Sequence, residues 1–143
     1  MRLSRLLWLP ACLGLFFLAG CSESTVTVNG KLIPPADVRI EKTDSVNVAF
    51  TPDPPGGKGK AWVGVFSPGE NTFVGKEVVP GTYKVTVQIE PYRGEKDSEK
   101  RSEAMKDMNV RFSGDNSKLK TEITGDRNQS IIVDMKSNSV TKG

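Results

Sequence analysis

The segment 78-VVPGTYKVTVQI-89 carries the most regular pattern in the 143-residue sequence. After Pro80-Gly81, apolar side chains recur at every second position, at Tyr83, Val85, Val87 and Ile89. The polar residues Lys84, Thr86 and Gln88 fall between them. A period of two residues places successive side chains on opposite faces of a strand. The segment therefore predicts a β-strand with one buried face, around which the rest of the domain is organised.

Segments on both sides of this strand show a similar pattern. Residues 46–50 alternate, so they predict a strand with Val46, Val48 and Phe50 on one face. Residues 60–66, K-A-W-V-G-V-F, are apolar on both faces, which predicts a central strand with Trp62 in the core. The Pro/Gly segment 51–59 predicts a loop between them. Toward the C-terminus, residues 117–135 predict a last hairpin that turns around Gly125-Asp126.

The first strand is predicted near Val26 and Val28, which alternate with threonines and run into Asn29-Gly30. Asn-Gly is favoured in a type I′ turn, because both central positions of that turn have positive φ. We therefore expect a strand, a tight turn and a second strand edge. Pro34-Pro35 closes the segment, since proline cannot donate a ladder hydrogen bond.

Residues 91–109 interrupt the β pattern with a charged segment. It holds five basic and five acidic residues without an apolar stripe: Arg93, Lys96, Lys100, Arg101, Lys106, Glu95, Asp97, Glu99, Glu103 and Asp107. This composition predicts a solvated loop with a helical turn at most over Ser98 to Met105. A mobile binding loop is the functional alternative, since loops on a rigid scaffold often carry function. The polar residues 137–143 are predicted to be a frayed tail.

The turn and strand Pro-Gly-x-Tyr-x-Val-x-Val at 80–87 resemble those of carboxypeptidase regulatory-like or transthyretin-like domains. The N-G-K-L segment at 29–32 and Asn71-Thr72-Phe73 add to the resemblance, although the family's middle element usually begins with Asp-Gly. The resemblance covers residues 26–89 and, more weakly, 117–135. It implies an all-β fold, a Greek-key β-sandwich of about seven strands, here spanning 26–136. Many lipoproteins of planctomycete-type bacteria carry such domains.

The first 20 residues predict a targeting signal that is removed. Arg2 and Arg5 precede an apolar run from Leu6 to Ala19, and the run ends in Leu18-Ala19-Gly20-Cys21. These last residues resemble a bacterial lipobox, which implies a diacylglycerol on the Cys21 sulfur and an acyl chain, such as palmitate, on its new amino group. Two or more acyl chains anchor a protein stably. Residues 21–25 would form a lipidated tether to the membrane.

Three alternatives compete with the lipobox hypothesis. An uncleaved transmembrane helix needs roughly 20 apolar residues, and this run is shorter. An ordinary signal peptide would be cut after a small-x-small motif, which Leu18-Ala19-Gly20 fits poorly. A buried structural cysteine at position 21 is the third. If lipidation holds, Ser22 after the cysteine favours the periplasmic face of the outer membrane or the cell surface.

Composition argues against several classes of function. Loss of Arg2 and Arg5 with the signal leaves 18 basic of the original 20 and all 17 acidic residues, so no one-signed surface for nucleic acid is predicted. The chain has no histidine, which removes Ser-His-Asp and Cys-His nucleophiles and the usual zinc ligands. Tyr92-Arg93-Gly94-Glu95 differs from the Tyr-Arg-Gly-Ser motif of transthyretin-like hydrolases by its last residue. We therefore predict no catalytic residue, metal or cofactor, and no small-molecule substrate.

These observations predict a non-enzymatic envelope lipoprotein whose β-sandwich is a structural or protein-interaction module. The alternative is a small glycan- or peptide-binding module on the envelope, with Trp62, Tyr92 and Arg93 as candidate contacts for the ligand or partner. A hydrolase with paired carboxylates ranks last, because no pair of acids is placed by the sequence across a cleft. The predicted partners are the membrane, through the lipid on Cys21, and an envelope protein or glycan.

Overall fold

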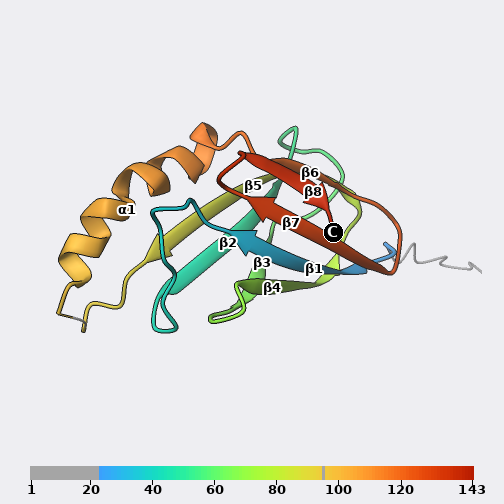
Figure 1. The fold of residues 1–143 in the computed structure, drawn as a ribbon. Helices are drawn as coiled ribbons and strands as arrows, with labels where there is room; N and C mark the ends of the chain where they lie inside the picture. The colour runs from blue at the N-terminus through green and yellow to red at the C-terminus, as the bar shows by residue number, and fades with distance from the viewer. Residues whose placement is uncertain (1–22, 95) are drawn as a thin grey trace, which may run out of the picture.

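A computed structural model describes residues 23–94 and 96–143 (Figure 1). Eight strands and one α-helix follow one another along the described chain. Their bounds are β1 (Val26–Ile33), β2 (Ser45–Pro52), β3 (Trp62–Ser67), β4 (Thr72–Val78), β5 (Gly81–Glu90), α1 (Ser98–Phe112), β6 (Lys120–Ile123), β7 (Asn128–Asp134) and β8 (Ser139–Lys142), with a 3-10 turn at Gly114–Asn116. The signal peptide 1–20 and the lipidation at Cys21 lie outside the described residues.

The eight strands form a single sheet in the order β6-β5-β2-β3-β4-β1-β7-β8. All neighbours are antiparallel except β1 and β7, which run parallel. The edge strands β6 and β8 contact each other, so the sheet curls into a barrel-like shape around its core. The prediction of a β-rich fold is confirmed. The strands number eight rather than about seven, and they belong to one curled sheet.

The strand predicted within residues 78–89, around which the domain was expected to be organised, is β5. Its side chains Tyr83, Val85, Val87 and Ile89 are all fully buried. β5 pairs with β2 from Tyr83 to Glu90 and with β6 over its first residues, Gly81 to Lys84. The alternating pattern was sufficient to predict this strand and its buried face, because side chains at every second position lie on the same face.

The tight turn predicted at Asn29-Gly30 is wrong, because β1 continues through both residues to Ile33. Phe73 on the neighbouring β4 lies directly over Gly30. A Cβ added at Gly30 would lie 1.9 Å from the Phe73 Cζ atom. The glycine is therefore required by the close approach of an aromatic ring within a strand, and a turn is not formed.

Four aromatic rings pack together beside β1, and we call Phe50, Trp62, Phe73 and Tyr83 the aromatic cluster. Phe50 stacks on Trp62 with centroids 3.7 Å apart and lies 5.8 Å from Phe73. Tyr83 meets both Phe50 and Trp62 edge-on. Trp62, expected in the core, is half-buried and packs against it. Its Nε1 is buried without a hydrogen-bond partner in the part of the chain that the structure describes.

The charged segment predicted as a loop over 91–109 contains most of a 15-residue helix, α1. Met105, Met108 and Phe112 lie three to four residues apart and are buried against the core. This stripe is narrow and begins only at the middle of the helix, so the charged residues dominate its composition. Helices of this kind are stabilised mainly by tertiary packing, which a single segment does not reveal.

The tail predicted to be frayed over 137–143 contains β8, so the folded domain extends past residue 136. β8 pairs antiparallel with β7 after a tight turn. The Asp134 carboxylate accepts hydrogen bonds from the backbone N–H groups of Lys136 and Ser137 in that turn. Within the residues that the structure describes, no helix is long and apolar enough to cross a membrane.

Candidate functional site

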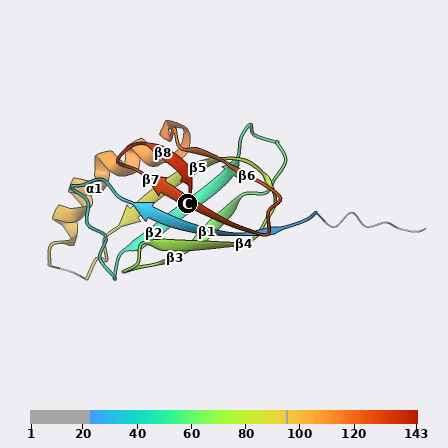
Figure 2. The same cartoon turned by 45° about the vertical axis from the view of Figure 1, so that its right-hand side comes forward.

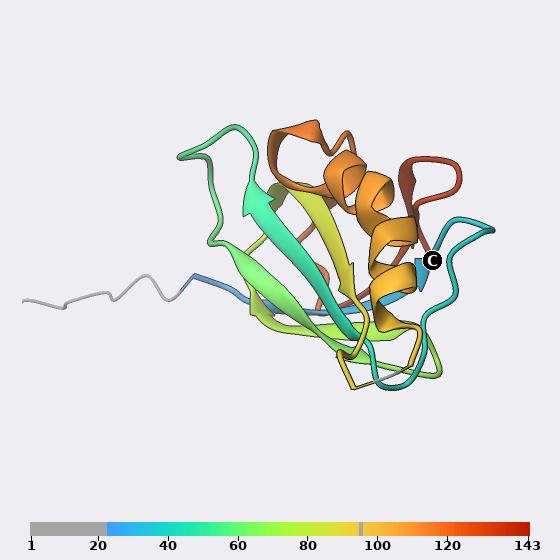
Figure 3. The same ribbon diagram turned by 90° about the vertical axis from the view of Figure 1, so that its left-hand side faces the viewer.

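A groove of about 870 Å³ lies between α1 and the last residues of β5. Figure 3 shows α1 running alongside β5 on the side that β6 leaves open. The wall from β5 and the segment after it consists of Gln88, Ile89, Glu90, Pro91 and Arg93. The wall from α1 and its end consists of Ser98, Glu99, Ser102, Glu103, Lys106, Asn109, Val110 and Ser113.

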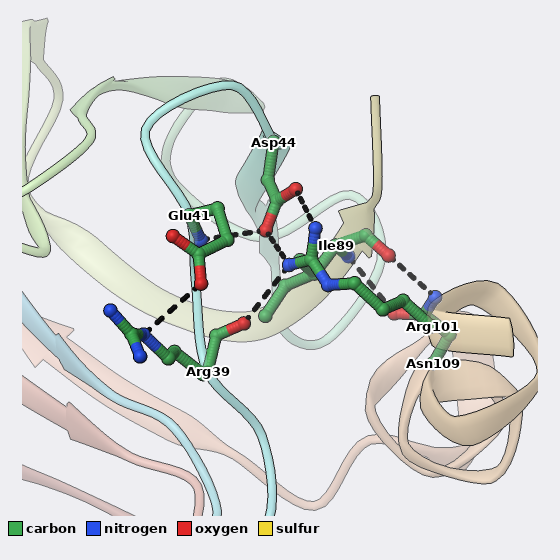
Figure 4. Close-up of polar contacts among 6 residues, drawn as sticks. All are labelled: Arg39, Glu41, Asp44, Ile89, Arg101 and Asn109. Carbon is green, nitrogen blue, oxygen red and sulfur yellow. Dashed lines mark hydrogen bonds and ion pairs between the residues drawn. The ribbon is translucent and has the colours of Figure 1, made fainter. Parts of the chain in front are cut away.

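The floor of this groove is set by Asn109, whose side chain bonds to the backbone of Ile89 (Figure 4). The Ile89 N–H donates to Asn109 Oδ1 at 2.9 Å, and Asn109 Nδ2 donates to the Ile89 carbonyl at 2.9 Å. Since β6 ends its pairing at Lys84, the amide takes the place that a longer β6 would occupy. One side chain thus satisfies both polar backbone groups of a buried strand residue.

A second contact ties the start of α1 to the segment between β1 and β2. Arg101 forms a bidentate ion pair with Asp44, with Nη2–Oδ2 at 2.6 Å and Nη1–Oδ1 at 3.0 Å (Figure 4). Arg101 Nη2 also donates to the Arg39 carbonyl at 3.2 Å. The Glu41 N–H donates to Asp44 Oδ2 at 2.8 Å. The Asp44 side chain is fully buried, so these donors replace the hydrogen bonds that its carboxylate would make to water.

The groove presents both charges together with apolar surface. Glu90, Glu99 and Glu103 carry negative charge, and Arg93 and Lys106 carry positive charge. Lys106 Nζ lies 3.6 Å from Glu103 Oε1 in an exposed pair. Ile89, Pro91 and Val110 supply apolar area, and Val110 is 55% exposed. Such a surface matches an extended peptide, which offers charges of both signs, backbone polar groups and apolar side chains.

The groove contains hydroxyl groups as well as charged side chains. Ser98, Ser102 and Ser113 line it, and a serine nucleophile needs an adjacent base. The chain contains no histidine to serve as that base. No cluster of three or more His, Cys, Asp or Glu residues that could hold a metal ion occurs among the residues described here.

One of the three candidate contact residues from the sequence, Arg93, lines this groove. Tyr92 is not among the lining residues, although Pro91 and Arg93 on either side of it are, and its side chain is 58% exposed. Trp62 lies elsewhere, because its ring stacks on Phe50 in the aromatic cluster. The fourth predicted site residue, Cys21, lies outside the described part of the chain.

Sequence reasoning missed Asp44, Arg101 and Asn109, which shape the groove. The signal for the last two is their eight-residue spacing, with Met105 halfway between them. That spacing places all three on one side of a helix. It becomes informative only when the segment is recognised as helical. Asp44 carries no local signal, since its partner is 57 residues away along the chain.

A second, shallower hollow of about 740 Å³ lies at the opposite end of the sheet. It is formed where β1 and β7 begin and β4 ends, and is lined by Thr25, Val26, Thr27, Lys76, Glu77, Arg127 and Asn128. Lys76 and Arg127 bring positive charge to the end of the molecule at which the described chain begins.

Three pKa shifts occur away from both hollows. Burial raises the pKa of the Tyr83 phenol above 10.0, and its hydroxyl donates to the Val79 carbonyl at 2.5 Å. The hydrogen bond and charge of Lys84 lower the pKa of Asp115. Hydrogen bonds from Ser137 lower the pKa of Asp134 in the turn before β8.

The chain was compared with protein-family models, curated proteins and solved structures, and none of them matched. Inferences about function therefore depend on the residues and on their geometry.

Proposed function

We propose that this chain is a lipid-anchored protein of the bacterial cell envelope whose β domain is a non-enzymatic interaction module. The observation that carries the proposal is Leu18-Ala19-Gly20-Cys21, which follows two arginines and an apolar run. Cys21 would be the first residue of the mature protein and the point of attachment of its acyl chains. The anchor would hold the domain at the periplasmic face of the outer membrane or at the cell surface.

The proposed family is that of the carboxypeptidase regulatory-like and transthyretin-like domains, with Greek-key connections between strands. Its support is the Pro80-Gly81 turn followed by Tyr83, Val85 and Val87, which begin the central part of β5. The tyrosine of this motif is fully buried and hydrogen-bonded to the Val79 carbonyl. The motif thus has a structural role in this chain.

The groove between α1 and β5 is the proposed binding surface, and an extended segment of an envelope protein is its proposed occupant. Charges of both signs and the apolar side chains Ile89, Pro91 and Val110 favour a peptide. A glycan is the second candidate, favoured by the exposed ring of Tyr92. It is the weaker one, because Phe50 stacks on the ring of Trp62, and Trp62 does not line the groove.

The anchor is tested with full-length protein expressed in a bacterium supplied with a labelled palmitate analogue. Wild-type protein should carry the label in the membrane fraction, and Cys21→Ser should carry none. Cys12→Ser is the matched control, because Cys12 lies within the removed signal and should leave labelling unchanged. Labelling that survives Cys21→Ser would refute the anchor.

The binding surface is tested with a photo-crosslinking residue placed at Ser102 in the groove or, as a control, at exposed Thr141 on β8. Adducts formed in intact cells should be identified by mass spectrometry and should depend on Ser102. The double change Arg93→Glu and Lys106→Glu should reduce them. Equal adducts from both positions would refute the groove as the binding surface.

A further inference from the structure

The outer face of β3 carries the most exposed aliphatic side chains of the described sheet. Val63 is 57% exposed and Val65 is 74% exposed, whereas the valines of β5 are fully buried. Their cross-strand neighbours extend the apolar area, since Ala49 of β2 pairs with Val63 and Val74 of β4 pairs with Val65. We call Ala49, Val63, Val65 and Val74 the valine face. Contiguous exposed apolar surface on a folded domain marks an interaction site.

The strand positions around the valine face are mainly uncharged polar residues. Apart from Ile33, the other outward positions of β1 to β4 carry hydroxyl, amide or lysine side chains: Thr27, Asn29, Lys31, Ser45, Asn47, Thr51, Ser67, Thr72 and Lys76. The acidic residues near this face are Glu77, at the end of β4 where its register with β1 shifts, Glu70 in the turn between β3 and β4, and Glu23 before β1. The charged side chains at these outward strand positions are Lys31 and Lys76 against Glu77. The two lysines suit a surface of lipid phosphates.

The start of the described chain lies beside β3. Glu23 Oε2 is 3.7 Å from the Nζ atom of Lys60, which is two residues before the first residue of β3. Both side chains are largely exposed, so the ion pair adds little stability. It shows, however, that Glu23 lies beside Lys60. Cys21 is two residues before Glu23, and two extended residues span at most about 7 Å. A lipid on Cys21 would therefore hold this side of the sheet close to the bilayer.

The arrangement of the elements leaves the candidate groove on another side. In Figure 2, β3 and β4 form the lower side of the molecule, and α1 lies at its upper left. A bilayer along β3 and β4 would not cover α1. The domain could therefore rest on the membrane and still bind a partner between α1 and β5.

We propose that the outer face of β3 and β4 lies against the bilayer that holds the lipid anchor. Val63 and Val65 enter the headgroup region, and Lys60 and Lys76 lie near lipid phosphates. The inference rests on the proposed lipidation of Cys21. Apolar contact and electrostatic attraction to anionic lipid then orient a domain that the acyl chains only tether.

The test uses full-length lipidated protein in vesicles of phosphatidylethanolamine and phosphatidylglycerol. An environment-sensitive fluorophore is attached at Val65→Cys or, as matched control, at Val110→Cys on α1, a valine of comparable exposure. Lipids with a nitroxide at the headgroup should quench the probe at position 65 several-fold more than the probe at position 110. Val63→Cys is a second position that should behave like 65. Lys76→Glu should reduce the quenching at 65, and Lys100→Glu on α1 should not.

The outcomes separate this inference from the proposed anchor, because mass spectrometry of the same protein reports the lipid on Cys21. Lipidated protein with equal quenching at 65 and 110 would overturn the docking of the valine face and leave the anchor intact. Protein without lipid on Cys21 would overturn both. Concentration-dependent cross-links between Val65→Cys copies in place of quenching would assign the face to a second copy. That result would also overturn the bilayer contact.

Discussion

The aromatic cluster and the docked helix α1 are attached to the same core by different physical means. The cluster is stabilised by tight packing, because the ring of Phe73 occupies the space that any side chain at Gly30 or Gly64 would need. α1 is held by a few buried apolar side chains and two polar contacts, Arg101 with Asp44 and Asn109 with Ile89. Tight packing tolerates no added atoms, whereas polar docking fails when one partner is removed. The two regions should therefore respond to different substitutions.

The largest effect is expected in the aromatic cluster, from Gly30→Ala. The new methyl group would overlap the Phe73 ring, so the free energy of unfolding should fall by about 3 kcal/mol. Urea denaturation followed by circular dichroism measures the change. Gly125→Ala is the matched control, because a Cβ at Gly125 meets no atom within 4 Å. If Gly30→Ala lowers the free energy of unfolding no more than Gly125→Ala does, tight packing around Phe73 does not stabilise this region.

The double variant Gly30→Ala with Phe73→Leu sharpens the same point. If the ring and the added methyl group compete for one space, the two changes should destabilise less together than the sum of their separate effects. Additive losses would place the conflict elsewhere.

The next largest effect is expected where α1 begins, from Arg101→Met. The change leaves the buried carboxylate of Asp44 without its cation, at a cost of about 2 kcal/mol, because Arg101 is itself partly exposed. Arg39→Met is the matched control, since the Arg39 side chain is 86% exposed in its pair with Glu41. Urea denaturation should rank Arg101→Met well below Arg39→Met in stability. Equal stability of the two variants would contradict the assignment.

A smaller effect is expected from Asn109→Ala at the middle of the groove. Loss of both hydrogen bonds to Ile89 should cost about 1.5 kcal/mol and speed hydrogen exchange at the Ile89 amide. Asn116→Ala removes an exposed hydrogen bond to the Val110 carbonyl and serves as the control. Unchanged exchange at Ile89 would mean that another group protects this strand edge.

The smallest effect is expected from Tyr83→Phe in the aromatic cluster, where shape is retained and one hydrogen bond is lost. The free energy of unfolding should fall by about 1 kcal/mol at neutral pH. Because burial raises the pKa of the folded phenol above 10.0, an unfolded tyrosine ionises first as the pH rises. Wild-type stability should therefore be complete below pH 10 and decline above it.

Denaturation of wild type and Tyr83→Phe at several values between neutral and alkaline pH measures this difference. The gap between the two proteins should narrow above pH 10, because only the wild type has this phenol to ionise. Parallel curves across the whole range would contradict the burial of the Tyr83 hydroxyl.

Local patterns predicted the strands that bury one face along their own length. β2 and β5 were predicted because a period-two pattern reports burial without reference to any neighbour. Residues 60–66 were predicted to form a central strand, and β3 is an interior strand of the sheet. The apolar sequence does not indicate whether a second layer covers its outer face, and Val63 and Val65 are exposed. Gly30 was assigned to a turn because the ring that requires it comes from Phe73, 43 positions later.

The sequence by itself determined that the domain is rich in half-buried strands and that it carries no histidine for catalysis or metal binding. Both follow from residue type and spacing alone. Only the tertiary structure decided that residues 98–112 form a helix, that 139–142 form a strand and that Arg93 lines a groove while Trp62 does not. The residue pattern of a short segment indicates which of its faces is buried. The element that packs against that face is determined by contacts between residues far apart in the chain, which the segment does not contain.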